Sequence, residues 1–258
     1  MFISYLFQQG FAASTITSTI SAISFVHKLC SLQDPTTSFL IKKLLSGAYN
    51  MRGTLDSRLP IDISILSSLI INSSKANFTH YMKTMFNAMC TLAFHAFLRI
   101  GEFCITTSTK LPHLIQLKDI SVITDSYMVI TIRHFKHNHQ QRPVSLNITT
   151  TKQTACPVWC MQHYLKLRGQ SPGPLFINPD GTPVHRLHFT RQLKLVLSIT
   201  GHNPANFNGH SFRIGAASTA AAKGLSDAQI QYMGRWNTNA FRRYIRIPTL
   251  SVTQKLDL

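Results

Sequence analysis

Residues 210–244 read HSFRIGAASTAAAKGLSDAQIQYMGRWNTNAFRRY, and this stretch decides both the fold and the chemistry of the chain. Its alanine-rich first part predicts a helix from residue 211 or 212 to residue 223, with Gly224 as a left-handed cap. His210 and Arg213 lie about one helical turn apart, so both side chains can face one anion near the helix N-terminus. The stretch therefore predicts a phosphate-binding site.

Two further helices are expected before residue 248. Ser226 and Gln229 form a capping-box pattern that begins the second helix, and Gly234 closes it. The third helix runs from residue 237 or 238 towards residue 247 and stops at Pro248. It carries three residues of chemical interest: Arg242, Arg243 and Tyr244.

The pattern H-x-x-R followed by GRWNTNAFRRYIR is similar to the C-terminal signature of tyrosine recombinases, the phage-integrase family. The GRW form most resembles recombinases of eukaryotic DIRS-like and Crypton-like mobile elements. The resemblance implies a mainly α-helical catalytic domain with a small antiparallel β-sheet or hairpin (α+β), a fold shared with type IB topoisomerases. It also implies that Tyr244 attacks a DNA phosphodiester. Because tyrosine has an unperturbed pKa of about 10 and the phosphate is an anion, this attack needs neighbouring cations.

The composition favours a polyanionic partner. The chain of 258 residues has 26 Lys and Arg against 9 Asp and Glu, a formal charge of +17, so we expect it to bind double-stranded DNA. No apolar run of spanning length and no signal-peptide layout is present, and we expect no membrane association. Five cysteines, an odd number in mostly apolar contexts, predict an intracellular protein. The resemblance to eukaryotic elements implies a nuclear location.

The first part of the chain predicts a small helical module. A helix is expected from residue 15 to about residue 29, and another from Asp34-Pro35 to near Gly47. The polar stretch 49–60 is typical of a linker, which sets a boundary near residue 55. In the resembled family a longer domain of this kind, the core-binding domain, grips DNA opposite the catalytic domain, and the protein acts as a dimer or tetramer. The predicted domains are a helical DNA-binding domain at 1–55 and a catalytic domain at 56–258.

The motif Leu98-Arg99-Ile100-Gly101, followed by Glu102, is similar to the family's first-arginine motif. The preceding segment 78–98 is apolar nearly all round and predicts a core helix, a rigid base from which Arg99 can hold two phosphate oxygens. Glu102 is the only glutamate in the chain and lies three residues from Arg99. It can orient that arginine, or it can form a surface salt bridge of little energetic value.

A change to alternating residues predicts an antiparallel hairpin, with strands near 128–133 and 142–146. Lys136 lies where the first strand meets the turn. The resembled family places a catalytic lysine on such a hairpin, which implies that Lys136 protonates the leaving 5′ oxygen. A simple phosphate contact is the alternative. The basic residues expected to contact DNA are Arg133, Arg142, Arg235, Arg242 and Arg243.

The resemblance implies a reaction without metal or cofactor. Arg99 and Arg213 would clamp the scissile phosphate and stabilise its pentacoordinate transition state. His210 would act as a general base or proton shuttle, and Tyr244 would form a 3′-phosphotyrosyl link. Tyr232 is a competing nucleophile, but it lies too close to Arg213 in sequence to match the family's spacing.

One position departs from the family pattern. A His or Trp usually follows directly after a glycine shortly before the nucleophile, whereas here Gly234 is followed by Arg235 and then by Trp236. We favour Trp236, because its indole N–H can donate to a phosphate oxygen while its ring packs. Arg235 is the alternative by residue counting.

Other classes of site are weaker. A helix is expected at about Pro157–Arg168 with Gly169 after it, and one face carries Cys156, Cys160 and His163. Three ligands are fewer than the four that structural zinc usually takes, so buried cysteines are the better interpretation. A second cluster contains His134, His137 and His139, which would need the turn to bring them together. Nuclease chemistry with Mg²⁺ requires clustered carboxylates, and the acidic residues are scattered singly. The main alternative function is a transposon-derived DNA-binding protein without catalysis.

Overall fold

A computed structural model describes residues 2–52, 57–107, 110–136, 138 and 142–246. The chain divides into two compact units, Met1–Ser57 and Arg58–Leu258. The predicted domain boundary at residue 55 lies outside the described residues. Among the residues that are described, no helix is both long and apolar enough to cross a membrane.

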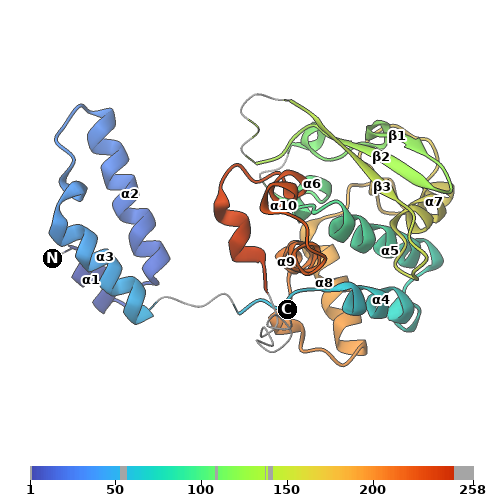
Figure 1. The fold of residues 1–258 in the computed structure, drawn as a ribbon, viewed down its shortest axis with the longest axis horizontal. Coiled ribbons are helices and arrows are strands. Elements are labelled where there is room, and N and C mark those ends of the chain that lie inside the picture. Colours follow the sequence, from blue (N-terminus) through green and yellow to red (C-terminus); the bar gives the residue numbers. More distant parts are fainter. Residues whose placement is uncertain (1, 53–56, 108–109, 137, 139–141, 247–258) are drawn as a thin grey trace, which may run out of the picture. The chain divides into compact units, whose positions relative to one another are not determined.

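Unit 1 is helical (Figure 1). Its segments are α1 (Phe2–Gln8), α2 (Ala13–Leu29), the 3-10 turn η1 (Pro35–Thr37) and α3 (Phe39–Arg52). The sequence predicted α2, but it did not predict α1. The helix expected from Asp34-Pro35 is split, because the Asp34 side chain accepts from the Thr36 N–H and closes a separate 3-10 turn. A small core holds the unit together: Ile3, Ala13, Ile16, Ile20 and Ala48.

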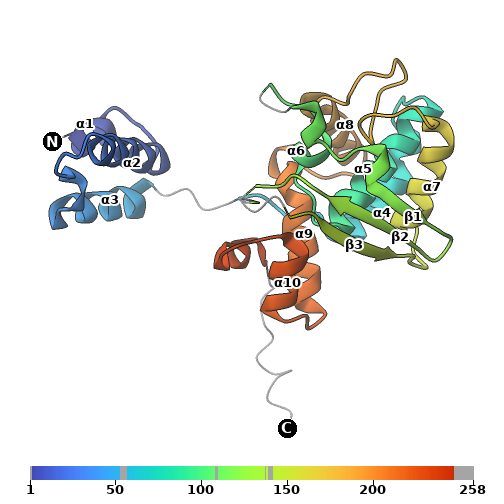
Figure 2. The ribbon, with the colours of Figure 1, turned by 90° about the horizontal axis from the view of Figure 1, so that it is seen from above.

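Unit 2 contains seven α-helices in its described part, together with a three-stranded sheet (Figures 1 and 2). The helices are α4 (Ile63–Asn72), α5 (His80–His95), α6 (Ile100–Phe103), α7 (Pro157–Arg168), α8 (Arg186–Ile199), α9 (Gly209–Ala222) and α10 (Asp227–Gly234). Short 3-10 segments connect them: η2 (Ser73–Lys75), η3 (Leu111–His113), η4 (Leu117–Asp119), η5 (Pro204–Asn206) and η6 (Asn239–Tyr244). The predicted bounds of α7 are confirmed.

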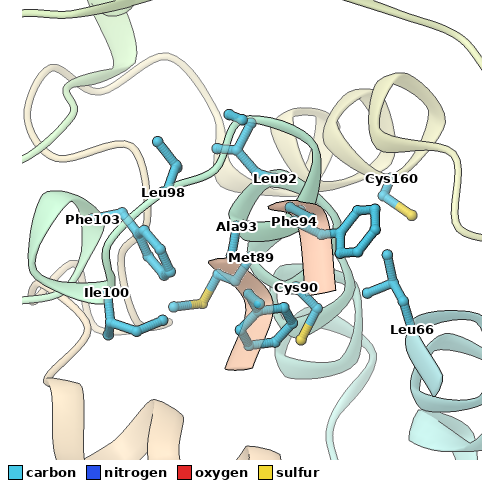
Figure 3. Packing of buried hydrophobic residues seen from close by; sticks show 14 of the residues in the cluster. Leu66, Met89, Cys90, Leu92, Ala93, Phe94, Leu98, Ile100, Phe103 and Cys160 are labelled. Atoms are coloured by element: carbon cyan, nitrogen blue, oxygen red, sulfur yellow. The ribbon is translucent and has the colours of Figure 1, made fainter. Parts of the chain in front are cut away.

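Helix α5 forms the centre of the core, as its all-round apolar sequence predicted. It begins after Thr79, whose side chain accepts from the Met82 N–H, and it packs against α7 and α9. Figure 3 shows its side chains among residues from α4, α6 and α7. The labelled α5 residues are Met89, Cys90, Leu92, Ala93 and Phe94. This packing gives the Leu98–Arg99 turn that follows α5 a rigid support.

The sheet is antiparallel with the order β1-β2-β3. Its strands are β1 (Ile120–Ile123), β2 (Tyr127–Ile132) and β3 (Val144–Thr149). The predicted hairpin is present as β2 and β3, which pair from Tyr127↔Thr149 to Ile132↔Val144. Strand β1 was not predicted. Alternate residues of β2 are buried, namely Met128, Ile130 and Ile132, and α7 contacts β3 (Figure 2). The predicted mainly helical class with a small antiparallel sheet is therefore confirmed.

Helix α9 begins at Gly209, earlier than the sequence predicted. Asn208 is the cap: its side chain accepts from the His210 N–H at 2.8 Å, and its own N–H donates to Ser211 Oγ at 3.0 Å. A Cβ at Gly209 would lie 2.1 Å from a side-chain carbon of Ile100, so glycine allows α9 to approach α6. His210 therefore lies in the first turn of α9.

The end of α10 differs from the prediction. Gly234 was expected to close the helix, yet the residue in the left-handed conformation is Arg235, with φ 52° and ψ 49°. A Cβ at Gly234 would come within 1.6 Å of the Trp236 ring. Gly234 is therefore needed for close packing, and the left-handed turn falls on the next residue.

The third predicted helix is a 3-10 helix. Segment η6 begins after Thr238, whose hydroxyl accepts from the Ala240 N–H, and it ends at Tyr244. The predicted helix is therefore present, although it is of the 3-10 type, with i→i+3 hydrogen bonds in place of the i→i+4 bonds of an α-helix. The predicted stop at Pro248 lies outside the described residues.

Candidate active site

All six residues predicted to be catalytic line one pocket of unit 2, with a volume of about 520 Å³. The sequence carries them on separate segments: Arg99 precedes α6, Lys136 follows β2, His210 and Arg213 lie on α9, and Trp236 and Tyr244 follow α10. The fold therefore brings together side chains that are far apart along the chain.

Arg99 is held by Glu102 at the start of α6. The Arg99 guanidinium donates to Glu102 Oε1 at 3.1 Å, and the Arg99 backbone N–H donates to Glu102 Oε2 at 3.0 Å. The Glu102 side chain is only 5% exposed, whereas Arg99 is 22% exposed and reaches the pocket. The contact is a buried ion pair that orients Arg99, and the alternative of a surface salt bridge is excluded.

Arg213 forms the floor of the site. Its guanidinium donates to the carbonyl of Phe97, and to the carbonyl of Gly234 at 2.8 Å. It also lies over the Trp236 ring, 4.2 Å from the centroid. Burial lowers the pKa of Arg213 to about 9, and the nearby Arg99 charge adds to this effect. Arg213 therefore remains a cation at neutral pH.

Tyr244 lies among aromatic rings and a cation. Its ring is nearly parallel to that of His210, with centroids 6.2 Å apart, and it is 5.3 Å from the Trp236 ring. The Arg213 guanidinium lies 5.7 Å from the Tyr244 centroid. Ser218 of α9 donates its hydroxyl to the Tyr244 carbonyl at 3.3 Å, which ties η6 to α9. The tyrosine is thus placed beside a base and a guanidinium.

His210 is a neutral imidazole at physiological pH. Burial, together with the smaller effect of the positive charges of Arg58, Arg213, Arg186 and Arg99, lowers its pKa to about 4. A neutral imidazole can accept a proton without first losing one. The geometry therefore suits His210 to a role as proton acceptor.

Two exposed cations complete the rim of the pocket. Lys136 extends from the segment after β2, as the sequence predicted. Arg186, the first residue of α8, also lines the pocket and was missed by the sequence analysis. No local sequence signal marks it, because its approach to the pocket depends on where the fold places α8.

Comparison with solved structures identifies the fold. The Tn1549 transposon integrase in complex with circular intermediate DNA matches with a TM-score of 0.63 at 15% identity, covering 98% of this chain and 81% of that chain. The XerH site-specific recombinase bound to palindromic difH substrate, a post-cleavage complex, matches with a TM-score of 0.62 at 13% identity, covering 94% and 66%. A lambda integrase dimer bound to a COC′ core site matches with a TM-score of 0.60 at 12% identity, covering 95% and 62%. The fold is that of a tyrosine recombinase catalytic domain.

No family model and no curated protein matches the chain by sequence. The tyrosine recombinase fold is therefore recognised from the structure and from a few site residues. The DIRS-like and Crypton-like lineage stays a prediction from the GRW motif.

Within the recombinase fold, Trp236 lines the pocket and Arg235 does not. The Arg235 side chain is 1% exposed and pairs with Glu102 at 3.0 Å. Burial lowers its pKa, and the Glu102 carboxylate opposes that shift. The prediction that Arg235 contacts DNA is wrong, because its side chain is buried and donates to acceptors in the interior.

The other arginines predicted to contact DNA are exposed but lie outside the pocket lining. Arg133 pairs with Asp119 at 2.6 Å and Arg242 pairs with Asp227 at 2.7 Å. Arg142 donates its backbone N–H to Asn138. Arg243 accepts at its carbonyl from the Arg246 guanidinium. These positions suit contacts with a DNA backbone rather than with reacting atoms.

The alternative nucleophile lies outside the pocket, and so do the described residues of the alternative metal sites that the sequence suggested. Tyr232 is 67% exposed and lies outside the pocket lining. The described residues contain no group of three His, Cys, Asp or Glu that could hold a metal ion. The Cys156 sulfur contacts the Thr150 hydroxyl at 3.2 Å, and Cys160 is buried. His134 stacks on His113 with centroids 4.5 Å apart, while the predicted partners His137 and His139 lie outside the described residues.

Proposed function

We propose that this protein is a site-specific DNA recombinase or integrase that cleaves and rejoins double-stranded DNA through a 3′-phosphotyrosyl intermediate. The observation that carries the proposal is the pocket in which Tyr244 lies beside a neutral His210 and the Arg213 guanidinium. The formal charge of +17 supports a nucleic-acid substrate. The Tn1549, XerH and lambda structures with the same fold are complexes with DNA.

In the proposed reaction the two pocket arginines bind the scissile phosphate. Arg99 is oriented by Glu102, and Arg213 is fixed by two main-chain carbonyls, so neither guanidinium has to reorganise when charge develops on phosphorus. Each guanidinium retains N–H donors beyond those contacts. One preorganised donor of this kind typically lowers an activation barrier by roughly 3–4 kcal/mol.

The bond changes are a transesterification. The Tyr244 oxygen bonds to phosphorus as its proton passes to His210, and the bond from phosphorus to the 5′ oxygen breaks as Lys136 protonates that oxygen. Trp236 packs beside the Tyr244 ring and can donate its indole N–H to the phosphate. The covalent link conserves the energy of the original phosphodiester. A second 5′ hydroxyl can therefore reverse the steps and rejoin DNA without metal, cofactor or ATP.

We also infer the wider setting of the reaction from the resemblance. Unit 1 would bind DNA as a core-binding domain, and the protein would act as a homo-oligomer on DNA inside the nucleus as part of a mobile element. The lambda integrase structure is of a dimer on a core site, which supports an oligomer. An analytical-ultracentrifugation measurement with and without a DNA duplex would detect that assembly.

Covalent trapping tests the proposed reaction. Wild type, Tyr244→Phe and Tyr232→Phe would be incubated in EDTA with nicked, randomised DNA duplexes. We expect denaturant-stable adducts with wild type and Tyr232→Phe, since Tyr232 lies outside the pocket lining, and none with Tyr244→Phe. Sequencing the trapped DNA would give the target site. DNA binding without any adduct would favour the alternative, a transposon-derived DNA-binding protein.

A further inference from the structure

Arg235 is a buried arginine that ties the end of α10 to the turn before α6. Its Nη1 donates to the carbonyls of Ala96 at 3.1 Å and Met233 at 3.2 Å. Its Nη2 donates to the carbonyl of Phe97 at 3.2 Å and to Glu102 Oε2 at 3.0 Å. Four acceptors are thus held by one side chain that does not line the pocket.

Glu102 is shared between two arginines of different exposure. Its Oε1 accepts from the Arg99 guanidinium at 3.1 Å, and its Oε2 accepts from both the Arg99 backbone N–H and Arg235. Arg99 reaches the pocket, whereas Arg235 is 1% exposed. A buried carboxylate keeps its position only when its oxygens are paired. Arg235 therefore fixes the group that orients Arg99.

The backbone around this network is held in a costly conformation. Phe97 and Arg235 are non-glycine residues with φ near 50°, at 50° and 52°. Such conformations persist when the surroundings determine them strongly, and they cluster at functional sites. The Phe97 carbonyl accepts from Arg235 and also from Arg213. One carbonyl thus links the buried arginine to a guanidinium of the pocket.

We propose that Arg235 is a positioning residue: through Glu102 and the Phe97 carbonyl, it sets the two pocket guanidinium groups for the scissile phosphate. This inference rests on the proposed function of the same site. Arg235 makes no contact with DNA in this role. The competing account is a purely structural arginine, for which the chain offers a comparison in Arg168, buried in α7 and bonded only to main-chain carbonyls among the described contacts.

The first test compares Arg235→Met with Arg168→Met. Both substitutions keep bulk and remove buried donors. We expect Arg235→Met to form the covalent adduct about 30-fold or more slowly in single turnover, with DNA affinity within about 3-fold of wild type. Arg168→Met should react within about 3-fold of wild type at temperatures where it is folded. Arg235→Lys, which can still reach the carboxylate, should recover part of the rate. Equal losses in both Met variants would overturn the proposal.

A double variant asks whether Arg235 acts through Glu102. We expect Glu102→Gln/Arg235→Met to be little slower than Glu102→Gln alone, because residues in one network are not additive. Fully additive losses would mean that Arg235 works independently of Glu102, and the assignment would be wrong.

A binding measurement separates this inference from the proposed function. The chain has two tryptophans, so Trp159→Phe leaves Trp236 of the pocket as the sole tryptophan, whose emission can be excited selectively over that of the tyrosines. In that background we would titrate sodium tungstate, a tetrahedral phosphate analogue. We expect binding that weakens about 10-fold in Arg235→Met and stays unchanged in Arg168→Met. If wild type binds tungstate but forms no adduct, only the proposed reaction fails. Undetectable tungstate binding, or equal affinity in Arg235→Met, would overturn the positioning role.

Discussion

The Arg213 guanidinium lies 4.2 Å from the centre of the Trp236 ring, and it donates to the carbonyls of Phe97 and Gly234. One buried cation thus joins α9, the turn after α5 and the segment after α10. A desolvated cation over an aromatic ring is worth about 2 kcal/mol or more. The side chain that would bind the scissile phosphate is therefore also a structural junction of the site.

Arg213→Lys should keep the positive charge of the site but slow the reaction. A lysine ammonium cannot stack flat on Trp236 while it donates to two carbonyls, because it lacks the planar fork of donors. We expect covalent adduct formation to slow by about 10²–10³-fold in single turnover. Arg191→Lys is the control, since Arg191 is exposed on α8 and lies outside the pocket lining. Similar rates for the two variants would contradict the clamp role of Arg213.

Ser218→Ala should make the position of Tyr244, the proposed nucleophile, less well fixed. The Ser218 hydroxyl donates to the Tyr244 carbonyl at 3.3 Å and accepts from the Arg246 N–H at 2.7 Å. Removal of the hydroxyl should lower the free energy of unfolding by about 1 kcal/mol and slow adduct formation by about 3–10-fold. Ser198→Ala removes an exposed hydroxyl that donates to the Lys194 carbonyl of the same helix, and should leave the rate unchanged. Thermal melts and single-turnover assays of both variants would measure the difference.

Local sequence signals predicted much of unit 2. Proline at the first position and glycine after the last gave the bounds of α7, and the Ser226–Gln229 capping box is present at the start of α10. The hairpin followed from alternating residues. In each case the residues that determine the element lie within or directly beside it in the sequence. A short stretch of sequence was therefore sufficient for the prediction.

Features that depend on distant contacts were missed or wrong. The left-handed turn falls on Arg235 because the Trp236 ring occupies the space beside Gly234, which no local rule for helix ends contains. The burial of Arg235, which was predicted to contact DNA, depends on Glu102, a partner remote in sequence. Arg186 enters the site through the placement of α8. The six predicted site residues followed from the resemblance to the tyrosine recombinase signature, and their assembly in one pocket required the structure.

The pH dependence of the reaction should report on His210. Its pKa is lowered to about 4 by burial and by neighbouring arginines, so the unfolded chain binds this proton more readily than the folded one. The contribution of a neutral His210 to the free energy of unfolding is therefore fully present above the ordinary histidine pKa of about 6.5, and it is lost as the pH falls towards 4. His95, whose pKa burial also lowers to about 4, acts in the same direction.

For activity, the adduct rate at subsaturating DNA should stay level from about pH 8 to pH 6 and fall only in more acidic buffer, where the free protein protonates His210. His210→Gln should be slower throughout and lack this acidic limb. Circular dichroism in the same buffers would show whether unfolding, to which His95 contributes, precedes the loss of rate. An inflection near pH 6.5 would indicate an imidazole with an ordinary pKa and would contradict the buried environment.

Gly234→Ala should displace Trp236 and, through it, the whole aromatic side of the site. The added Cβ would come within 1.6 Å of the indole ring, and this ring supports both Arg213 and Tyr244. Overpacking of this kind typically costs about 1–3 kcal/mol. We expect a lower melting temperature, changed tryptophan fluorescence and an adduct rate reduced by about 10-fold or more. Gly47→Ala is the control: it lies within α3, nothing lies within 4 Å of its added Cβ, and alanine should stabilise that helix by about 0.5–1 kcal/mol. Unchanged fluorescence and an unchanged adduct rate in Gly234→Ala would mean that the position of the Trp236 ring does not require a glycine at residue 234.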